Sequence, residues 1–397
     1  MRIVAADIYD VNLHHWKPPI ILRLITDEGL YGLGEFPLAY GAGRKAAIGM
    51  LQDLLEGWVL GADPLRIESI WHTLFRRTFW GQGGGPVIYG GISTIDQALW
   101  DIKGKAAGCP IYELLGGRVH DELRVYANGW YSAEWAPENH RRPVTPEEFA
   151  DIAAKVVALG YDALKFNPFG APPGSGWPDH ERVLDPRRAD LGYERVAAVR
   201  DAVGPDVDIL VEVHGWLGPM SAIEMGNRLV PLRPFCYEEP VDAMNVECMR
   251  LVAENVPLPI AAGERLYTRY QFREYLEKQV LDIVQPDVGL AGGITETRKI
   301  AAMAETYNVH IQPHNCHGPI ATAAAVQVDA CSTNFIIQEV VPFRGDIAYD
   351  SVTDPLERRI VNGRLPVPTA PGLGVELNED HVARCPRIRV GESRFGT

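Results

Sequence analysis

The sequence predicts an α/β fold, in which a (β/α)8-type barrel follows a smaller N-terminal α+β domain. From about residue 120, short apolar runs alternate with amphipathic stretches of helical periodicity, a pattern typical of parallel strands joined by crossover helices. Eight such runs fit into roughly 220 residues, and eight is the number of strands that closes a barrel. A doubly wound open sheet is the alternative, but no G-x-G-x-x-G follows an early strand of this chain.

The first 118 residues have the pattern of a separate α+β domain. Apolar runs at 3–11, 20–25 and 30–35, with a turn at 27–29, predict a three-stranded meander. The glycine-rich segment 80–86 predicts a loop, because glycine loses the most conformational freedom in a helix or strand. Helical periodicity is found around this loop and before it, near 44–58, 64–78 and 93–107.

One unit of the barrel region shows why each helix is expected. Thr145 is a suitable N-cap, and Pro146 suits the first helical position. Apolar residues from Phe149 to Val157 then recur at helical spacing along one face, and residues 161–166 form the next strand. Later strands are expected to end near Glu212, Glu238, Gly263, Gln285, Gln312 and Gln338. Residues 345–397 contain several prolines and no repeat, and we expect them to pack back on the N-terminal domain.

The composition excludes several classes of protein. The 397-residue chain has a net charge of −14 and no basic patch, so nucleic acid is not an expected partner. No stretch has the roughly 18 apolar residues of a membrane helix, so no membrane partner is expected. A charged residue follows Met1, and the six cysteines form no C-x-x-C pair. These features predict a cytoplasmic protein with free thiols.

Polar residues recur at the ends of the predicted strands. Successive groups from Glu212 onward are 23 to 27 residues apart, which is about one strand–helix unit. Because the carboxyl ends of barrel strands meet at one mouth, we expect these side chains to form a ring there. The ring comprises Lys165, Asn167, Glu212, His214, Glu238, Glu264, Asp287, His314 and Glu339.

Three carboxylates of this ring predict a metal site. Glu212, Glu238 and Glu264 on consecutive strands would repel one another unless a cation neutralises them. An all-oxygen ligand set suits one Mg²⁺ per subunit, with Mn²⁺ as a substitute, whereas zinc favours histidine or cysteine. Glu239 competes with Glu238 for this role, since only one of two neighbouring side chains on a strand points into the mouth.

The other members of the ring suggest proton transfer next to a carboxylate. Lys165 and the cation would hold a substrate carboxylate and stabilise the charge that develops when its α-carbon loses a proton. His314, oriented by Asp287, is the expected base. His310 and His317 are rivals, but His310 lies within a strand run and His317 lies beyond it in a loop.

Two further residues have more than one interpretation. His214 points to the same face as Glu212 and is expected to protonate a leaving hydroxyl. Its alternative role is that of a neighbour that orients a metal ligand. Glu339 would either hydrogen-bond the developing enediolate, if protonated, or bind a substrate hydroxyl.

These motifs together resemble the enolase superfamily, within its mandelate racemase-like subgroup. The segments 260–265 (IAAGER) and 237–240 (YEEP) are similar to metal-ligand motifs of that family. The segments 285–287, 292–296 and 313–314 are similar to its His–Asp region, and 95–104 to the last helix of its capping domain. The resemblance implies a capping domain at 1–118, with 345–397 packed on it, and a modified TIM barrel of (β/α)7β type at 119–344.

Within the subgroup the chain looks most like acid-sugar dehydratases of the galactonate dehydratase type. Lys165-Phe166-Asn167 stands where many members have K-x-K, so the second base of a two-base racemase is absent and Asn167 is left to bind substrate. Glu212-Val213-His214-Gly215 resembles the dehydratase D-x-H-G, with Glu in place of Asp. The resemblance also places His15 and Trp80 in loops that close over the substrate, and it implies a homo-oligomer, from dimer to octamer.

The resemblance implies dehydration of an aldonic or aldaric acid, a small polyhydroxy acid, to a 2-keto-3-deoxy acid through a metal-stabilised enediolate. Such an enzyme is a hydro-lyase. An epimerase, racemase or lactone cycloisomerase on the same scaffold is the first alternative. A non-catalytic barrel that only binds or assembles is the second, and it predicts lost ligands or a lost base. The insertion 170–188 would act either as a lid or as an oligomer contact.

Overall fold

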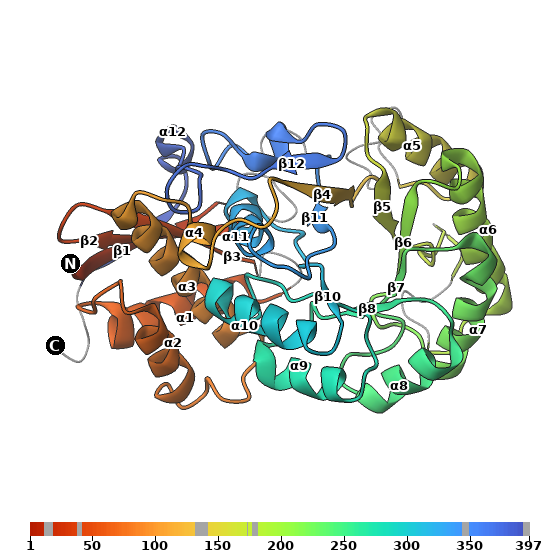
Figure 1. Cartoon of the computed structure of the whole chain (residues 1–397), viewed down its shortest axis with the longest axis horizontal. Helices are drawn as coiled ribbons and strands as arrows, with labels where there is room; N and C mark the ends of the chain where they lie inside the picture. Colours follow the sequence, from red (N-terminus) through yellow and green to blue (C-terminus); the bar gives the residue numbers. More distant parts are fainter. Residues whose placement is uncertain are drawn as a thin grey trace.

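The computed structural model places a small α+β unit beside a barrel (Figure 1). It describes residues 1–11, 19–37, 42–131, 142–172, 174–176, 182–343 and 349–391. The α/β fold class predicted from the sequence is confirmed. Within the described ranges, no helix is both long and apolar enough to span a membrane.

The N-terminal sheet has four antiparallel strands in the order β13-β1-β2-β3. The predicted meander is present as β1 (Ile3–Asp10), β2 (Ile20–Thr26) and β3 (Tyr31–Phe36). The edge strand β13 (Arg387–Val390) comes from the far end of the chain and was not predicted. Arg389 on β13 forms an ion pair of 3.0 Å with buried Asp7 on β1, which ties the two distant segments together.

Helices cover this sheet, and the longest differs from its prediction. Helix α3 (Pro86–Ala107) begins at Pro86 rather than near residue 93, with Gly85 as N-cap and proline in the first turn. Gly90 lies inside it because the Phe36 ring of β3 packs there, and a Cβ atom would come within 2.3 Å of that ring. The other helices here are α1 (Arg44–Leu54), the π-helical turn η1 (Leu55–Val59), α2 (Ile67–Arg76) and α4 (Ile111–Leu114).

The barrel contains eight parallel strands in the order β10-β9-β8-β7-β6-β5-β4-β11. An isolated bridge between Ile311 and Phe335 connects β10 to the segment that leads into β11, so the sheet curls round on itself. The strands are β4 (Glu122–Ala127), β5 (Ala163–Phe166), β6 (Asp208–Glu212), β7 (Cys236–Glu238), β8 (Ile260–Ala262), β9 (Ile283–Val284), β10 (His310–Ile311) and β11 (Gln338–Val340).

Helices follow the first seven strands and form the outer layer (Figure 1). They are α5 (Pro146–Ala158), α6 (Pro186–Val203), α7 (Pro219–Leu229) with the 3-10 turn η2 (Val230–Leu232), α8 (Val246–Asn255), α9 (Thr268–Glu277), α10 (Gly293–Glu305) and α11 (Pro319–Asp329). Thr145 and Glu148 form a capping box at the start of α5, as expected of a threonine at this position. No helix directly follows β11 in the described part of the chain, where the next elements are the 3-10 turn η4 (Leu356–Arg359), β12 (Arg364–Pro366) and α12 (Glu379–Val382).

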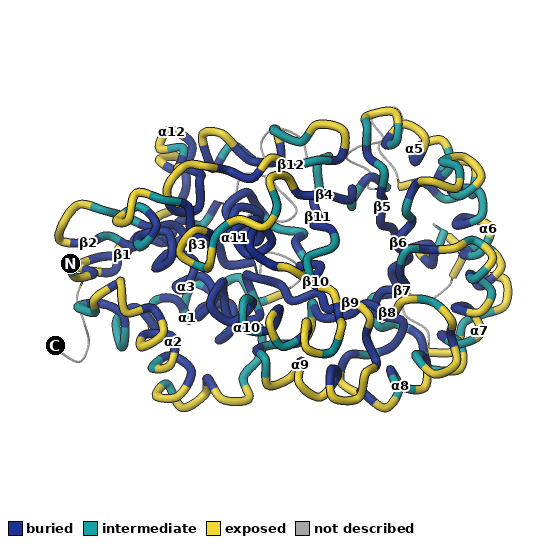
Figure 2. The backbone as a smooth tube through the Cα atoms, in the orientation of Figure 1, coloured by how far each residue is buried: buried dark blue, intermediate teal, exposed yellow. Residues whose placement is uncertain are grey.

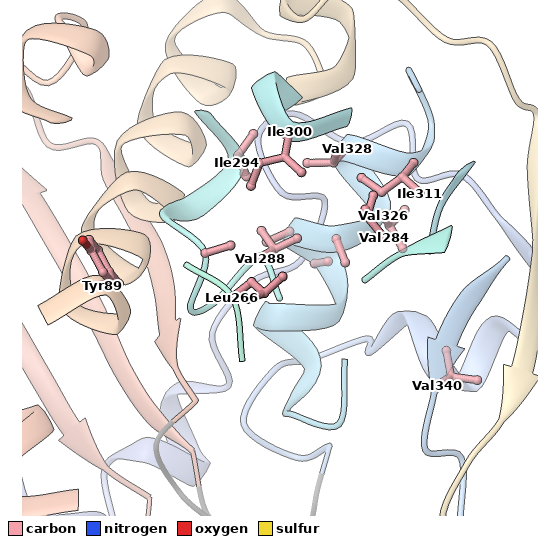
Figure 3. Packing of buried hydrophobic residues seen from close by; sticks show 14 of the residues in the cluster. Tyr89, Leu266, Val284, Val288, Ile294, Ile300, Ile311, Val326, Val328 and Val340 are labelled. Atoms are coloured by element: carbon pink, nitrogen blue, oxygen red, sulfur yellow. The ribbon is translucent and has the colours of Figure 1, made fainter. Parts of the chain in front are cut away.

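Burial follows this layering (Figure 2). Most strand residues are buried, whereas the outer faces of the surrounding helices are exposed. Around the last barrel helices, Ile294 and Ile300 of α10 lie beside Val328 of α11 (Figure 3). This apolar packing fixes the backbone from which the polar groups at the strand ends project.

Candidate active site

Lys165 lies at the centre of the candidate site. It is the third residue of β5 and is fully buried. Its Nζ lies 2.6 Å from Glu238 Oε1, 3.1 Å from Glu339 Oε1 and 3.6 Å from Glu212 Oε2. Burial lowers the pKa of Lys165, but these three carboxylates raise it well above its ordinary value. The three carboxylates therefore favour the ammonium form of Lys165.

The three predicted metal ligands come together at the strand ends. Glu212 and Glu238 are register partners on β6 and β7, and Glu264 follows β8. One carboxylate oxygen from each lies within 4.8 Å of the other two. Burial raises the pKa of Glu238 to about 7, with help from Glu212 and Glu339 and against the effect of Lys165. These carboxylates carry more negative charge than one lysine neutralises.

This donor set fits a hard divalent cation. Glu238 Oε2 is buried and has no hydrogen-bond partner among the described residues, and an unpaired buried oxygen is costly unless something binds it. Three carboxylates and no nitrogen or sulfur ligand match the preference of Mg²⁺. Glu212, Glu238 and Glu264 are thus the residues that would hold the ion.

The structure separates Glu239 from this cluster. Glu239 adopts a left-handed backbone conformation, with φ of 42°, and its buried carboxylate pairs with Arg265. The same Arg265 nitrogen, Nη1, also lies 2.7 Å from Glu264 Oε1. Arg265 was not predicted as a site residue, although its position directly after Glu264 was a usable signal.

The expected His–Asp pair is present, and it contains a second histidine. His314 Nδ1 donates to Asp287 Oδ2 at 2.7 Å, and His317 Nε2 donates to the same oxygen at 2.5 Å. Burial raises the pKa of Asp287, but the two imidazoles lower it well below its ordinary value. Asp287 is therefore ionised and fixes the His314 ring. His317, considered only as a rival base, is instead a partner of the same carboxylate.

The other nitrogen of His314 faces the mouth. Its Nε2 lies 3.3 Å from Glu264 Oε2 and 3.9 Å from Glu339 Oε2. Burial lowers the pKa of His314, but Cys316, Glu264 and Glu339 raise it well above its ordinary value. Positive charge bound at the glutamates would lower this pKa, because it would offset those carboxylates. The rival His310 is exposed on β10, with its Nδ1 at 3.3 Å from the Asn334 carbonyl.

Asn167 and Glu212 hold His214 between them. The Phe169 backbone N–H donates to Asn167 Oδ1 at 2.9 Å, so the amide NH₂ faces His214 Nδ1 at 3.0 Å. Since Nδ1 accepts there, the proton of the neutral ring sits on Nε2. That nitrogen lies 2.8 Å from Glu212 Oε1. The Nε2–H of His214 can therefore orient Glu212, a predicted metal ligand. The same proton is also the one that His214 would donate to a leaving hydroxyl.

Glu339 is held as a carboxylate. Asn128 Nδ2 donates to its Oε1 at 2.6 Å, and the Asn315 backbone N–H donates to its Oε2 at 2.8 Å. Burial raises its pKa, but Lys165 and His314 lower it to about 2. This low pKa disfavours the protonated form of Glu339 and favours the alternative role, in which the carboxylate accepts a hydrogen bond from a substrate hydroxyl.

The eighth strand, β11, begins at Gln338, although residues 335–337 were expected to form it.

The structure describes only one of the two residues expected in the closing loops. His15 lies outside the described residues. Trp80 is 73% exposed and packs edge-on against Phe79, with ring centroids 4.9 Å apart. Tyr89, at the other end of that segment, packs against Tyr267, with the rings tilted by 30° and their centroids 5.6 Å apart. The structure describes only parts of the insertion 170–188, and its role stays a prediction.

Comparison with known families agrees with this architecture. Residues 148–381 match the family model described as enolase C-terminal domain-like. Residues 11–116 match the N-terminal domain model of mandelate racemase and muconate lactonizing enzyme. Members of this superfamily generally use Mg²⁺.

Individual relatives cover almost the whole chain. A D-galactonate dehydratase of Variovorax paradoxus is 38% identical over 93% of this chain and 91% of its own length. A D-galactonate dehydratase of Xanthomonas campestris is 38% identical over 94% of this chain and 93% of its own length. A solved enolase-superfamily member from Salmonella Typhimurium has a TM-score of 0.93 at 40% identity, covering 98% of this chain and 99% of its own. The chain therefore belongs to the enolase superfamily, in its mandelate racemase and muconate lactonizing enzyme branch, and is a hydro-lyase.

Proposed function

We propose that this enzyme is a Mg²⁺-dependent dehydratase of an aldonic or aldaric acid, with D-galactonate as the first substrate to test. The relatives that match nearly the whole chain and carry the name D-galactonate dehydratase support this choice. The product would be a 2-keto-3-deoxy acid.

The observation that carries the proposal is the placement of two imidazoles around the acidic cluster. His314 follows β10 and its Nε2 approaches Glu264, whereas His214 follows β6 and its Nε2 approaches Glu212. Strands β7, β8 and β9 separate β6 from β10 in the sheet. A base and an acid on opposite sides of a carboxylate-binding site are what elimination of water requires.

Each residue of the site has a separate role in the first half of the reaction, the removal of the C2 proton. Glu212, Glu238 and Glu264 would hold Mg²⁺, which would supply positive charge to stabilise a deprotonated α-carbon next to a carboxylate. Lys165 holds the substrate carboxylate. His314 Nε2 takes the C2 proton, while Asp287 accepts the Nδ1–H and stabilises the imidazolium. Glu339 accepts a hydrogen bond from a substrate hydroxyl.

The second half of the reaction releases water. As the C2–H electron pair forms the C2–C3 double bond, the C3–O bond breaks. His214 donates its Nε2 proton to the departing hydroxyl, which leaves as water. The resulting enol takes up a proton at C3 and releases the proton of its C2 hydroxyl, which gives the 2-keto-3-deoxy acid. The substrate therefore loses one water, and there is no net oxidation or reduction.

The test is an end-point assay for 2-keto-3-deoxy acids with D-galactonate and a panel of other aldonates and aldarates. We expect a keto product that requires Mg²⁺, disappears with EDTA and is absent in His314→Asn. His310→Asn is the matched control, since this exposed histidine begins β10, four residues before His314. Solvent deuterium at C2 without any keto product would overturn dehydration in favour of an epimerase.

We also infer that the enzyme assembles as a homo-oligomer of two to eight subunits, as the family resemblance implies. Light scattering coupled to size-exclusion chromatography measures the subunit number directly. A monomer at micromolar concentration would contradict this inference.

A further inference from the structure

A cavity of about 540 Å³ lies at the junction of the two domains. Its walls come from the start of α2, from α3 and the end of α4, and from the first turns of α10. Helix α3 packs against both α2 and α10 (Figure 1). None of the lining residues belongs to the ring at the barrel mouth. The volume is within the range of about 300–1,000 Å³ that is typical of small-molecule sites.

Four cationic side chains line this cavity, although the chain as a whole has a net charge of −14. They are Arg66, Lys103, Arg298 and Lys299. The lining contains one carboxylate, that of Glu68, which accepts from Lys299 Nζ at 2.7 Å. Four cations and one carboxylate leave an excess of three positive charges. A concave surface lined by one sign of charge attracts ions of the other sign, so this cavity favours an anion.

The excess charge is not neutralised by the protein around it. In the described part of the chain, Arg66 and Arg298 form no ion pair with a carboxylate. Lys103 faces the ring of Trp100 instead, with its Nζ 5.2 Å from the ring centroid. A cavity of this volume is roughly 10 Å across, which is about the Debye length at 0.1 M salt, so its cations repel one another. A bound anion would relieve this repulsion.

The helices that carry these cations are held together by hydrogen bonds across the junction. Trp100 Nε1 on α3 donates to Thr295 Oγ1 on α10 at 2.8 Å, and this hydroxyl donates to the buried Asp96 on α3 at 2.6 Å. Trp100 and Thr295 both line the cavity. Lys103 and Arg298 each follow one of these two residues by three positions, which places them on the same helix faces. The fold therefore gathers the cations before any ligand binds, which lowers the ordering cost of binding.

The lining residues match an organic phosphate better than a simple carboxylate. A phosphate monoester carries a charge of about −1.5 to −2 at pH 7, so two such groups would balance the excess of three, whereas a carboxylate brings a single charge. The two guanidinium groups can each bind phosphate oxygens in a bidentate manner. Two exposed apolar side chains, Leu65 and Leu114, also line the cavity and can contact the carbon part of such a ligand.

We propose that this cavity binds a small organic molecule with two phosphate groups, and that the ligand ties the N-terminal domain to the barrel. Arg66 and Lys103 would hold it from the N-terminal domain, and Arg298 and Lys299 from the barrel. The proposal is independent of the dehydration proposed above, because none of these residues takes part in that reaction.

Calorimetric titration of the full-length enzyme in saturating Mg²⁺ tests the binding. The probe is fructose 1,6-bisphosphate, which has two phosphates and no carboxylate, and fructose and succinate are the comparison compounds. We expect one bisphosphate per chain, no binding of fructose, and at least about 10-fold weaker binding of succinate. Arg66→Gln and Arg298→Gln should each weaken bisphosphate binding about 10- to 100-fold. Arg273→Gln, at an exposed arginine of α9, is the matched control and should keep the affinity.

Amide hydrogen exchange locates the bound probe. Exchange should slow in residues 65–69 and 295–299 together, and the unfolding temperature should rise with the bisphosphate concentration. Wild-type affinity in both Arg66→Gln and Arg298→Gln would overturn the site, as would an absence of both heat and thermal shift in the wild type. Equal binding of succinate would overturn the preference for phosphate. None of these measurements needs turnover, so failure of this site is distinguishable from failure of the proposed function.

Discussion

Glu35, on the last strand of the N-terminal meander, accepts a hydrogen bond of 2.6 Å from the backbone N–H of Gly318 in the barrel. Its second oxygen accepts from the backbone N–H of Ala321 at 3.1 Å. Gly318 is the N-cap of helix α11, and Ala321 lies in its first turn. The buried Glu35 carboxylate of the N-terminal domain therefore caps a helix of the barrel. The loop that carries His314 ends at this contact, which couples the domain junction to the active site.

Loss of this cap should destabilise the protein. Glu35→Ala leaves two buried N–H groups unpaired and should lower the free energy of unfolding by about 1–3 kcal/mol. Glu35→Gln keeps one acceptor and should cost less. Urea unfolding measures the change, and faster amide exchange at Gly318 and Ala321 localises it. Glu28→Ala removes an exposed ion pair of the same domain and should change stability by less than about 1 kcal/mol. Equal effects of Glu28→Ala and Glu35→Ala would contradict this interpretation.

Asn167 should act as a positioning residue for His214. Asn167→Leu removes the donor that holds Nδ1, and we expect kcat to fall about 10- to 100-fold with KM little changed. Asn227→Leu, at an exposed asparagine of α7, is the control for the substitution itself. In a double-mutant cycle, Asn167→Leu should cost little once His214→Asn is present. Additive losses would show that Asn167 acts independently of His214.

The acidic cluster should respond to Mg²⁺ in the absence of substrate. Mg²⁺ at 100 times its Kd should raise the free energy of unfolding by about 2.7 kcal/mol, since it binds only the folded protein. Glu238→Gln should lose most of this gain, and the exposed Glu254→Gln should keep it. Thermal unfolding with Mg²⁺ and with EDTA measures the difference. A full Mg²⁺ response in Glu238→Gln would remove that residue from the ligand set.

The domain junction should also make stability depend on pH. Asp96 on α3 is buried, and its two oxygens accept from the Thr295 N–H at 3.0 Å and the Thr295 hydroxyl at 2.6 Å. Burial raises its pKa from 3.8 to about 7, although the bonds to Thr295 oppose this. The folded state therefore binds more protons than the unfolded state between these values, and its stability falls as pH rises through them.

The comparison with Asp96→Asn isolates this contribution. The stability of wild type relative to Asp96→Asn should be highest below about pH 4 and should decrease by roughly 4 kcal/mol as pH rises through 7. Urea unfolding of both proteins at several pH values measures it. A difference that grows with pH would show that Asp96 is ionised in the folded state throughout.

The sequence by itself was sufficient to predict the barrel and the grouping of the three glutamates. Strand and helix periodicities differ along the chain, and consecutive parallel strands place their carboxyl ends at one edge, so residues one unit apart in sequence become neighbours in space. Glu212, Glu238 and Glu264 could be grouped on that spacing alone. The start of α3 was missed because glycines at its beginning hide a helix that the Phe36 ring stabilises.

Only the tertiary structure decided which atoms meet. The choice of Glu238 over Glu239 depends on a left-handed backbone turn and on Arg265. The shared contact of His314 and His317 with Asp287, and the contact of Glu35 with Gly318, join residues from different elements. Such contacts have no periodicity in the sequence, because they arise from how finished elements pack and from side-chain directions that local preferences do not set.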